Sequence, residues 1–192
     1  MKKLLPLILL MLMAVSVKAV DVKGQIITGK DTMNVMLKIP VNMISQQPAY
    51  KNLQNKIRYI TEDGEKKKLK PDMADEIKFK FGNDTIRMVS VPDPVGGSHD
   101  GYFDYFIFIK IYVDGKIKLY QHYSTPMYGN NGKVWYLKKE DQPLKLVADF
   151  GRKKMKKYFS DCPELVKKIE SKEFKGKDII QIVQFYNSNC LN

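Results

Sequence analysis

The sequence predicts an α+β fold in which a mainly antiparallel β body precedes a C-terminal helical hairpin. Strand-like runs with period-two alternation dominate the chain up to residue 147, and turns containing glycine or aspartate separate them. From residue 148 onward, apolar residues recur at helical spacing instead. Strands grouped before helices are typical of α+β domains, so we expect about 8–10 short strands arranged as a sandwich or a partly open barrel.

The first nineteen residues have the pattern of a cleavable export signal. Two lysines precede an apolar run at residues 4–15, and small residues lie around Ala19. That run is shorter than the roughly 20 residues of a relaxed membrane span, although an uncleaved anchor is the alternative. We therefore expect a signal peptide at 1–19, a β-rich body at 20–147, and a helical segment at 148–192 packed on the same domain. The mature protein would be periplasmic or extracellular, with no membrane span.

The strands of the β body are identified by their turns and their alternation. Runs at 22–28 and 33–39 flank a turn at Gly29 and predict an opening hairpin. The polar stretch at 41–55 predicts a long connection with one helical turn. Alternation at 103–113 predicts a central strand with both faces largely covered. The other strands are expected at 56–60, 77–81, 85–91, 116–123, 133–139 and 144–147.

Two cysteines flank the last two expected helices, Cys162 before the first and Cys190 after the second. An even pair in an exported protein predicts a disulfide, and an antiparallel helical hairpin brings its outer ends together. Closing a loop of roughly 29 residues stabilises a protein by about 3 to 4 kcal/mol in the loop-entropy model. The alternative is two unpaired thiols. Asp161 and Glu164 have the spacing of a capping box at the start of the first of these helices.

The chain carries a formal net charge of +12, which becomes +9 once the three lysines of the signal peptide are removed. This charge is concentrated at 66–70 and on one expected helix. Basic amphipathic helices are typical of proteins that bind anionic surfaces, so an anionic envelope surface or a polysaccharide is the expected partner, and nucleic acid is not. A solvated face that keeps the protein soluble is the alternative. The basic surface candidates are Arg152, Lys153, Lys154, Lys156 and Lys157.

Other chemistry-bearing residues lack the spacing of a catalytic or metal site. Ser98, His99 and Asp100 are contiguous, so they predict a loop and not a hydrolytic triad. His122 lies among tyrosines with no further ligands at metal spacing. Acids at 72–76 and 93–104 would support glycoside hydrolysis only if two carboxylates lay close together. We expect no catalytic residue, metal or cofactor. Nine of the aromatic residues between 102 and 136 predict core packing, with a ligand-binding cleft as the alternative: Tyr102, Phe106, Phe108, Tyr112, Tyr120, Tyr123, Tyr128, Trp135 and Tyr136.

Several segments resemble a family of uncharacterised secreted proteins of Gram-negative bacteria. The segment at 158–165 (YFSDCPEL) is the most specific of them; the others are 24–28 with Asp31 and Thr32, 71–79, 172–178 and 185–187. The resemblance implies export and a β-rich body with a helical tail, and it transfers no activity. We therefore expect an exported, non-enzymatic binding or envelope-associated domain of unknown ligand. A secreted hydrolase acting on extracellular glycan or another polymer is the alternative.

Overall fold

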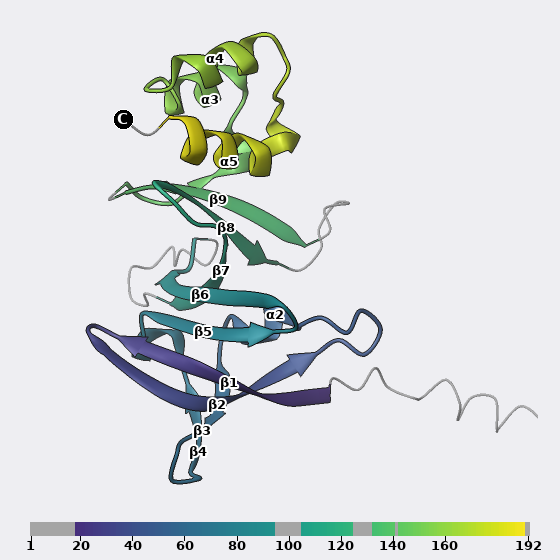
Figure 1. Ribbon diagram of the computed structural model, residues 1–192, viewed down its shortest axis with the longest axis vertical. Helices are drawn as coiled ribbons and strands as arrows, with labels where there is room; N and C mark the ends of the chain where they lie inside the picture. Colours follow the sequence, from purple (N-terminus) through teal and green to yellow (C-terminus); the bar gives the residue numbers. More distant parts are fainter. Residues whose placement is uncertain (1–17, 95–104, 125–131, 141, 191–192) are drawn as a thin grey trace, which may run out of the picture.

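The computed structural model describes residues 18–94, 105–124, 132–140 and 142–190 (Figure 1). These residues contain ten strands and four α-helices, with short 3₁₀ turns between some of them. The strands are β1 (Lys18–Thr28), β2 (Asp31–Val41), β3 (Ile57–Ile60), β4 (Lys66–Leu69), β5 (Glu76–Phe81), β6 (Asp84–Pro92), β7 (Phe106–Val113), β8 (Ile117–Tyr123), β9 (Lys133–Lys139) and β10 (Lys145–Leu146). The helices are α2 (Tyr50–Leu53), α3 (Arg152–Tyr158), α4 (Pro163–Glu170) and α5 (Ile179–Asn189).

All ten strands belong to one antiparallel sheet with the order β10-β9-β8-β7-β6-β5-β1-β2-β3-β4. The sheet is open, and the predicted α+β class with antiparallel strands is confirmed. β1 to β4 form one meander, after which the chain returns so that β5 pairs with β1 and a second meander begins. The strands succeed one another along the long axis of the molecule, and α3, α4 and α5 lie at the β9 end (Figure 1).

One end of the sheet builds a core mainly from strands, which we call the N-terminal core. Leu37, Ile39 and Ile77 have no exposed surface, and Leu53 brings α2 into the same cluster. Gly24 lies at the junction of β1, β2 and β5. A Cβ atom there would be 2.5 Å from Leu37 Cδ1 and 2.9 Å from the Lys78 carbonyl oxygen, so the close approach of the strands requires glycine.

The other end of the sheet is covered by helices, and we call this cluster the C-terminal core. Ile117, Leu119 and Leu137 supply the sheet side. The helices contribute fully or almost fully buried side chains: Met155, Phe159, Leu165, Ile169, Ile179, Ile182, Val183 and Tyr186. A smaller cluster lies on the other face of the three strands β7, β8 and β9, because neighbouring residues of a strand point to opposite faces. It consists of Ile107, Ile109, Ile111, Tyr120 and Tyr136.

β7 departs from the regular alternation that the sequence predicts. The register of β7 with β8 shifts between Ile111 and Val113, so Tyr112 is an extra residue in the strand. Ile111 packs with the cluster around Tyr120, whereas Val113 packs against the C-terminal core. The alternation predicted over 103–113 would place residues 111 and 113 on one face, and this part of the prediction is wrong. The predicted central position is confirmed, since Phe108 and Ile109 on opposite faces are both fully buried.

The predicted disulfide between Cys162 and Cys190 is present, with a Cα–Cα distance of 5.4 Å, and it joins the start of α4 to the end of α5. The predicted capping box is wrong, because Cys162 is the N-cap residue of α4 and no side chain caps this helix. The Asp161 carboxylate instead accepts hydrogen bonds from Lys139 Nζ at 2.6 Å and from the Tyr186 hydroxyl at 2.5 Å.

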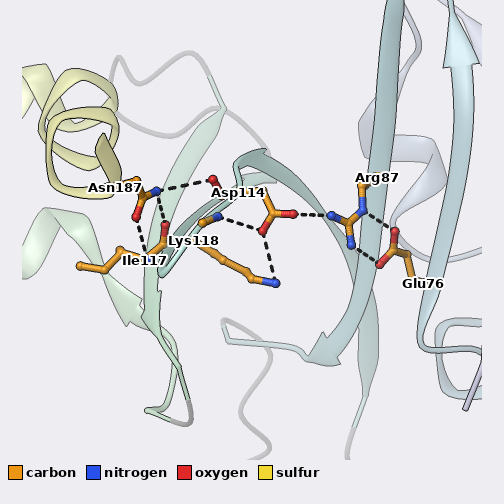
Figure 2. Close-up of polar contacts among 7 residues, drawn as sticks. Glu76, Arg87, Asp114, Ile117, Lys118 and Asn187 are labelled. Atoms are coloured by element: carbon orange, nitrogen blue, oxygen red, sulfur yellow. Dashed lines mark hydrogen bonds and ion pairs between the residues drawn. The ribbon is translucent and has the colours of Figure 1, made fainter. Parts of the chain in front are cut away.

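A chain of polar contacts joins α5 to the middle of the sheet (Figure 2). The Asn187 side chain accepts a hydrogen bond from the Ile117 amide at 3.0 Å and donates one to the Ile117 carbonyl at 2.8 Å. Asp114, in the β7–β8 turn, forms an ion pair with Arg87 on β6. Arg87 also forms a bidentate pair with Glu76 on β5, at 2.5 and 2.7 Å. The polar network thus joins the two halves of the protein: the half with the C-terminal core, through α5, and the half with the N-terminal core, through β5.

β1 begins at Lys18, two residues before the expected mature N-terminus at Val20, and residues 1–17 lie outside the described part. Export and signal cleavage stay predictions. No helix among the described residues is long and apolar enough to cross a membrane.

Candidate functional site

A groove lies between the β9–β10 hairpin and α3. Its cavity has a volume of about 860 Å³. Its described lining combines lysines with aromatic and apolar side chains: Pro94, Tyr136, Lys139, Gln142, Leu144, Lys145, Leu146, Asp149, Phe150, Lys154, Lys157, Tyr158 and Ser160. Four lysines and a single acidic residue of the described chain therefore line the same cavity.

The burial of α3 orients its lysines toward the groove. Met155 and Phe159 are 2% and 0% exposed and pack in the C-terminal core, which fixes the rotation of the helix. Lys154 and Lys157 are three residues apart, so they project from one side of the helix, and both line the groove. Lys145 lies across from them on β10. The groove therefore has positive side chains on both walls.

One of the four lysines is neutralised within the protein. Lys139 donates a hydrogen bond to Asp161 and lies 5.3 Å from the centre of the Tyr186 ring. Burial alone lowers the pKa of Lys139, but the hydrogen bonds to Asp161 and Tyr186 outweigh it, and the net shift is upward. Lys145, Lys154 and Lys157 form no ion pair within the described ranges. Their charges are available to an anion in the groove.

Two aromatic rings form the wall next to α3. The Phe150 and Tyr158 rings meet edge to face, with centroids 5.2 Å apart. The Tyr158 hydroxyl is buried and has no hydrogen-bond partner in the described part of the chain. Burial, together with the nearby Tyr186 and Asp161, raises the pKa of Tyr158 to about 12, so this hydroxyl stays protonated. An unpaired buried donor costs stability unless a water molecule or a ligand accepts its hydrogen bond.

The five basic residues predicted from the sequence fall into three environments. Lys154 and Lys157 line the groove. Arg152 and Lys153 are exposed outside it. Lys156 forms an ion pair with Glu170 on α4. The sequence pattern therefore found one wall of the groove. It missed Lys139 and Lys145, because only the folded chain brings β9 and β10 beside α3.

The apolar side of α3 faces the protein interior. A helix that rests on a membrane needs a free apolar face to enter the lipid, whereas Met155 and Phe159 are enclosed by α4, α5 and the sheet. This packing does not support insertion of α3 into lipid, and binding of residues 152–157 to an anionic surface stays a prediction. The basic side chains remain suited to an anion that approaches from solvent.

The other candidate residues do not converge on a site among the described residues. His122 is 7% exposed beside Tyr136, and burial lowers its pKa. Asp75 accepts a hydrogen bond from the Gly29 amide, and Glu76 pairs with Arg87. No group of three or more His, Cys, Asp or Glu side chains suited to a metal ion occurs in these ranges. Residues 98–100 and Asp104 lie outside the described part.

Comparisons with known proteins provide no further assignment. No protein-family model, no curated protein and no solved structure was found to match the chain. The resemblance to uncharacterised secreted proteins stays a prediction, and the function must be inferred from the groove itself.

Proposed function

We propose that this protein is an exported binding domain that holds an acidic polysaccharide in the groove between β9–β10 and α3. The observation that carries the proposal is the convergence of Lys145, Lys154 and Lys157, none ion-paired within the described chain, on one cavity of about 860 Å³. Lysine ammonium groups attract carboxylates and sulfates from solvent. The Cys162–Cys190 disulfide supports export, since such bonds persist in oxidising compartments.

The shape of the site favours a polymer over a membrane surface. A groove walled by a hairpin and a helix accommodates a chain, and the Phe150 and Tyr158 rings offer apolar contact to it. Insertion of α3 into a membrane would require an exposed apolar face on this helix, and that face is buried. An acidic polysaccharide combines repeated negative charge with a narrow cross-section, which matches both features.

The proposal is tested by isothermal titration calorimetry with carboxymethyl-dextran. Unmodified dextran, which has the same backbone and no charge, is the control polymer. We expect only the charged polymer to bind, more weakly as salt rises. The double variant Lys154→Gln/Lys157→Gln should bind about three- to tenfold more weakly, because exposed charge contacts contribute a few tenths to 1 kcal/mol each.

The matched control is Arg152→Gln/Lys153→Gln, which removes the same charge from the same helix outside the groove. We expect this variant to lose less than twofold in affinity. Equal losses in both variants would mean diffuse attraction to a basic protein and would overturn the groove assignment. Release of reducing ends from the polymer would support the hydrolase alternative instead.

A further inference from the structure

A second group of rings and a lysine comes from α2, β7 and β9, and none of its members lines the groove. Tyr136 lines the groove, and its neighbour on β9, Trp135, points to the other side of the strand. There the Trp135 ring meets the Tyr112 ring edge to face, with centroids 4.8 Å apart. Tyr112 is 45% exposed, so part of this aromatic pair is open to solvent.

Contacts of α2 and the residue after it fix the position of a second pair of rings, Tyr50 and Tyr123. Gln54, which follows α2 and is 4% exposed, accepts a hydrogen bond from the Tyr123 amide at 2.6 Å and donates one to the Tyr123 carbonyl at 3.1 Å. Its carbonyl accepts a bond from the Phe108 amide at 2.9 Å. These contacts place Tyr50 on the Tyr123 ring in a stacked pair, with centroids 5.0 Å apart.

Lys110 lies among these rings, and no carboxylate of the described residues pairs with it. Its Nζ donates a hydrogen bond to the Tyr50 hydroxyl at 3.1 Å and lies 4.4 Å from the Tyr50 ring centre and 5.7 Å from that of Tyr112. No acid in the described part of the chain forms an ion pair with it. An ammonium group has three donors, and the Tyr50 hydroxyl takes only one of them.

The surroundings of Lys110 favour an additional anion. Burial lowers the pKa of Lys110; Asp84 opposes this shift, and Lys133 adds to it. A half-buried ammonium group that is only partly compensated is costly, and a bound negative charge would remove that cost. The rings beside it add apolar contact, as in most small-molecule sites.

We propose that Lys110, Tyr50, Tyr112 and Trp135 form a binding site for a carboxylate carried on a six-membered ring. The carboxylate would accept hydrogen bonds from the free donors of Lys110, and the ring of the ligand would pack on the exposed part of Tyr112 and Trp135. A sugar acid and an aromatic acid share this chemistry. The site is separate from the groove and goes beyond the proposed polysaccharide binding.

Trp135 is the single tryptophan of the chain, so its fluorescence reports directly on this site. We expect a saturable change in emission on titration with glucuronate or with benzoate, and none with glucose or benzyl alcohol at the same concentrations. Saturation by the first acid would identify a sugar-acid site, and saturation by the second an aromatic-acid site. No saturable response to either acid would overturn the proposal.

Two variants locate the response. Lys110→Met keeps the length of the side chain and should weaken binding of the responding acid about tenfold, because the anion loses its partly buried cation. Lys78→Met, which removes an exposed lysine from β5, is the matched control and should leave the affinity unchanged. Equal affinity in Lys110→Met and the unmodified protein would contradict the site.

Tyr112→Leu keeps the proposal testable if Lys110→Met fails to fold. Tyr112 is exposed, so its replacement should preserve the fold while removing the ring surface. We expect a weakening of three- to tenfold, whereas Lys154→Gln/Lys157→Gln should respond to the acid like the unmodified protein. A loss in the groove variant with none in Tyr112→Leu would place the acid in the groove and overturn the second site.

Discussion

The two ends of the sheet cover the same type of apolar surface in different ways. The N-terminal core closes mainly with strands, and α2, a helix of four residues, is the helix that packs into it. The C-terminal core is covered by α3, α4 and α5, which have 7, 8 and 11 residues. Helices of this length are marginal in isolation, so the second core depends more on contacts that hold the helices in place.

Those contacts are concentrated where the helices meet the sheet. The disulfide joins α4 to α5, the Asp161 carboxylate links Lys139 to Tyr186, and the Asn187 side chain pairs with the backbone of β8 (Figure 2). In the N-terminal core, backbone hydrogen bonds between strands hold the elements together, since β1 pairs with β2 over eleven residues. The helices on this sheet therefore depend on a disulfide and on side-chain contacts for their position, whereas the strands are held by backbone hydrogen bonds.

The largest effect should follow from removing the disulfide. We expect Cys162→Ala/Cys190→Ala to lower the free energy of unfolding by about 3 to 4 kcal/mol, because the unfolded chain regains the entropy of an open loop. Urea unfolding measures the total loss. Hydrogen exchange should show that α4 and α5 of the variant exchange through local opening and are less protected than β1 and β2, which exchange on global unfolding. Equal protection of these helices and strands in the variant would contradict the difference between the two ends.

A smaller effect is expected where the two halves are joined. Arg87→Met leaves Glu76, whose side chain is only 13% exposed, without its bidentate partner, and also removes the contact to Asp114. We expect a loss of about 1 to 3 kcal/mol in urea unfolding. Arg58→Met, at an exposed arginine on β3, is the matched control and should change stability by less than about 0.5 kcal/mol. Equal effects would mean that the polar network does not join the halves.

The fold was predictable to the extent that its signals are local. Turns such as Gly29 and alternation within each run located the strands, and the spacing of Cys162 and Cys190 around two helices predicted their bond. The pairing of β1 with β5 and the extra residue at Tyr112 depend on contacts between distant segments, which no local pattern reports.

The candidate sites were predictable only in part for the same reason. Lys154 and Lys157 are visible in the sequence as members of a basic helix, but the opposite wall with Lys145 requires the packed hairpin. Asp161 illustrates how tertiary contacts override a local motif, since its carboxylate binds Lys139 and Tyr186 and does not cap α4. Lys110 is one lysine among many until α2 brings Tyr50 beside it.

The smallest predicted effect is a pH dependence that originates at the helical end. At Asp161, burial alone raises the pKa, but hydrogen bonds from Lys139 and Tyr186 outweigh it, and the net shift is downward. At Asp114, burial is likewise outweighed by Lys118 and Arg87, and the pKa is lowered. A lowered folded-state pKa contributes stability above the ordinary aspartate pKa of about 3.9, and that stability is lost as the pH falls through the folded-state value.

We therefore expect acidification from pH 6 to pH 3 to lower the free energy of unfolding of the unmodified protein more than that of Asp161→Asn. The difference between the two losses should be no more than about 1 kcal/mol, because Asp161 is partly solvated. Urea unfolding at both pH values measures this difference. The control is Asp63→Asn. Hydrogen bonding to Thr61 lowers the pKa of Asp63, but its carboxylate is fully exposed in the β3–β4 turn. This variant should therefore lose as much stability on acidification as the unmodified protein. An Asp161→Asn variant as acid-sensitive as the unmodified protein would show that its carboxylate does not fasten the helices to the sheet.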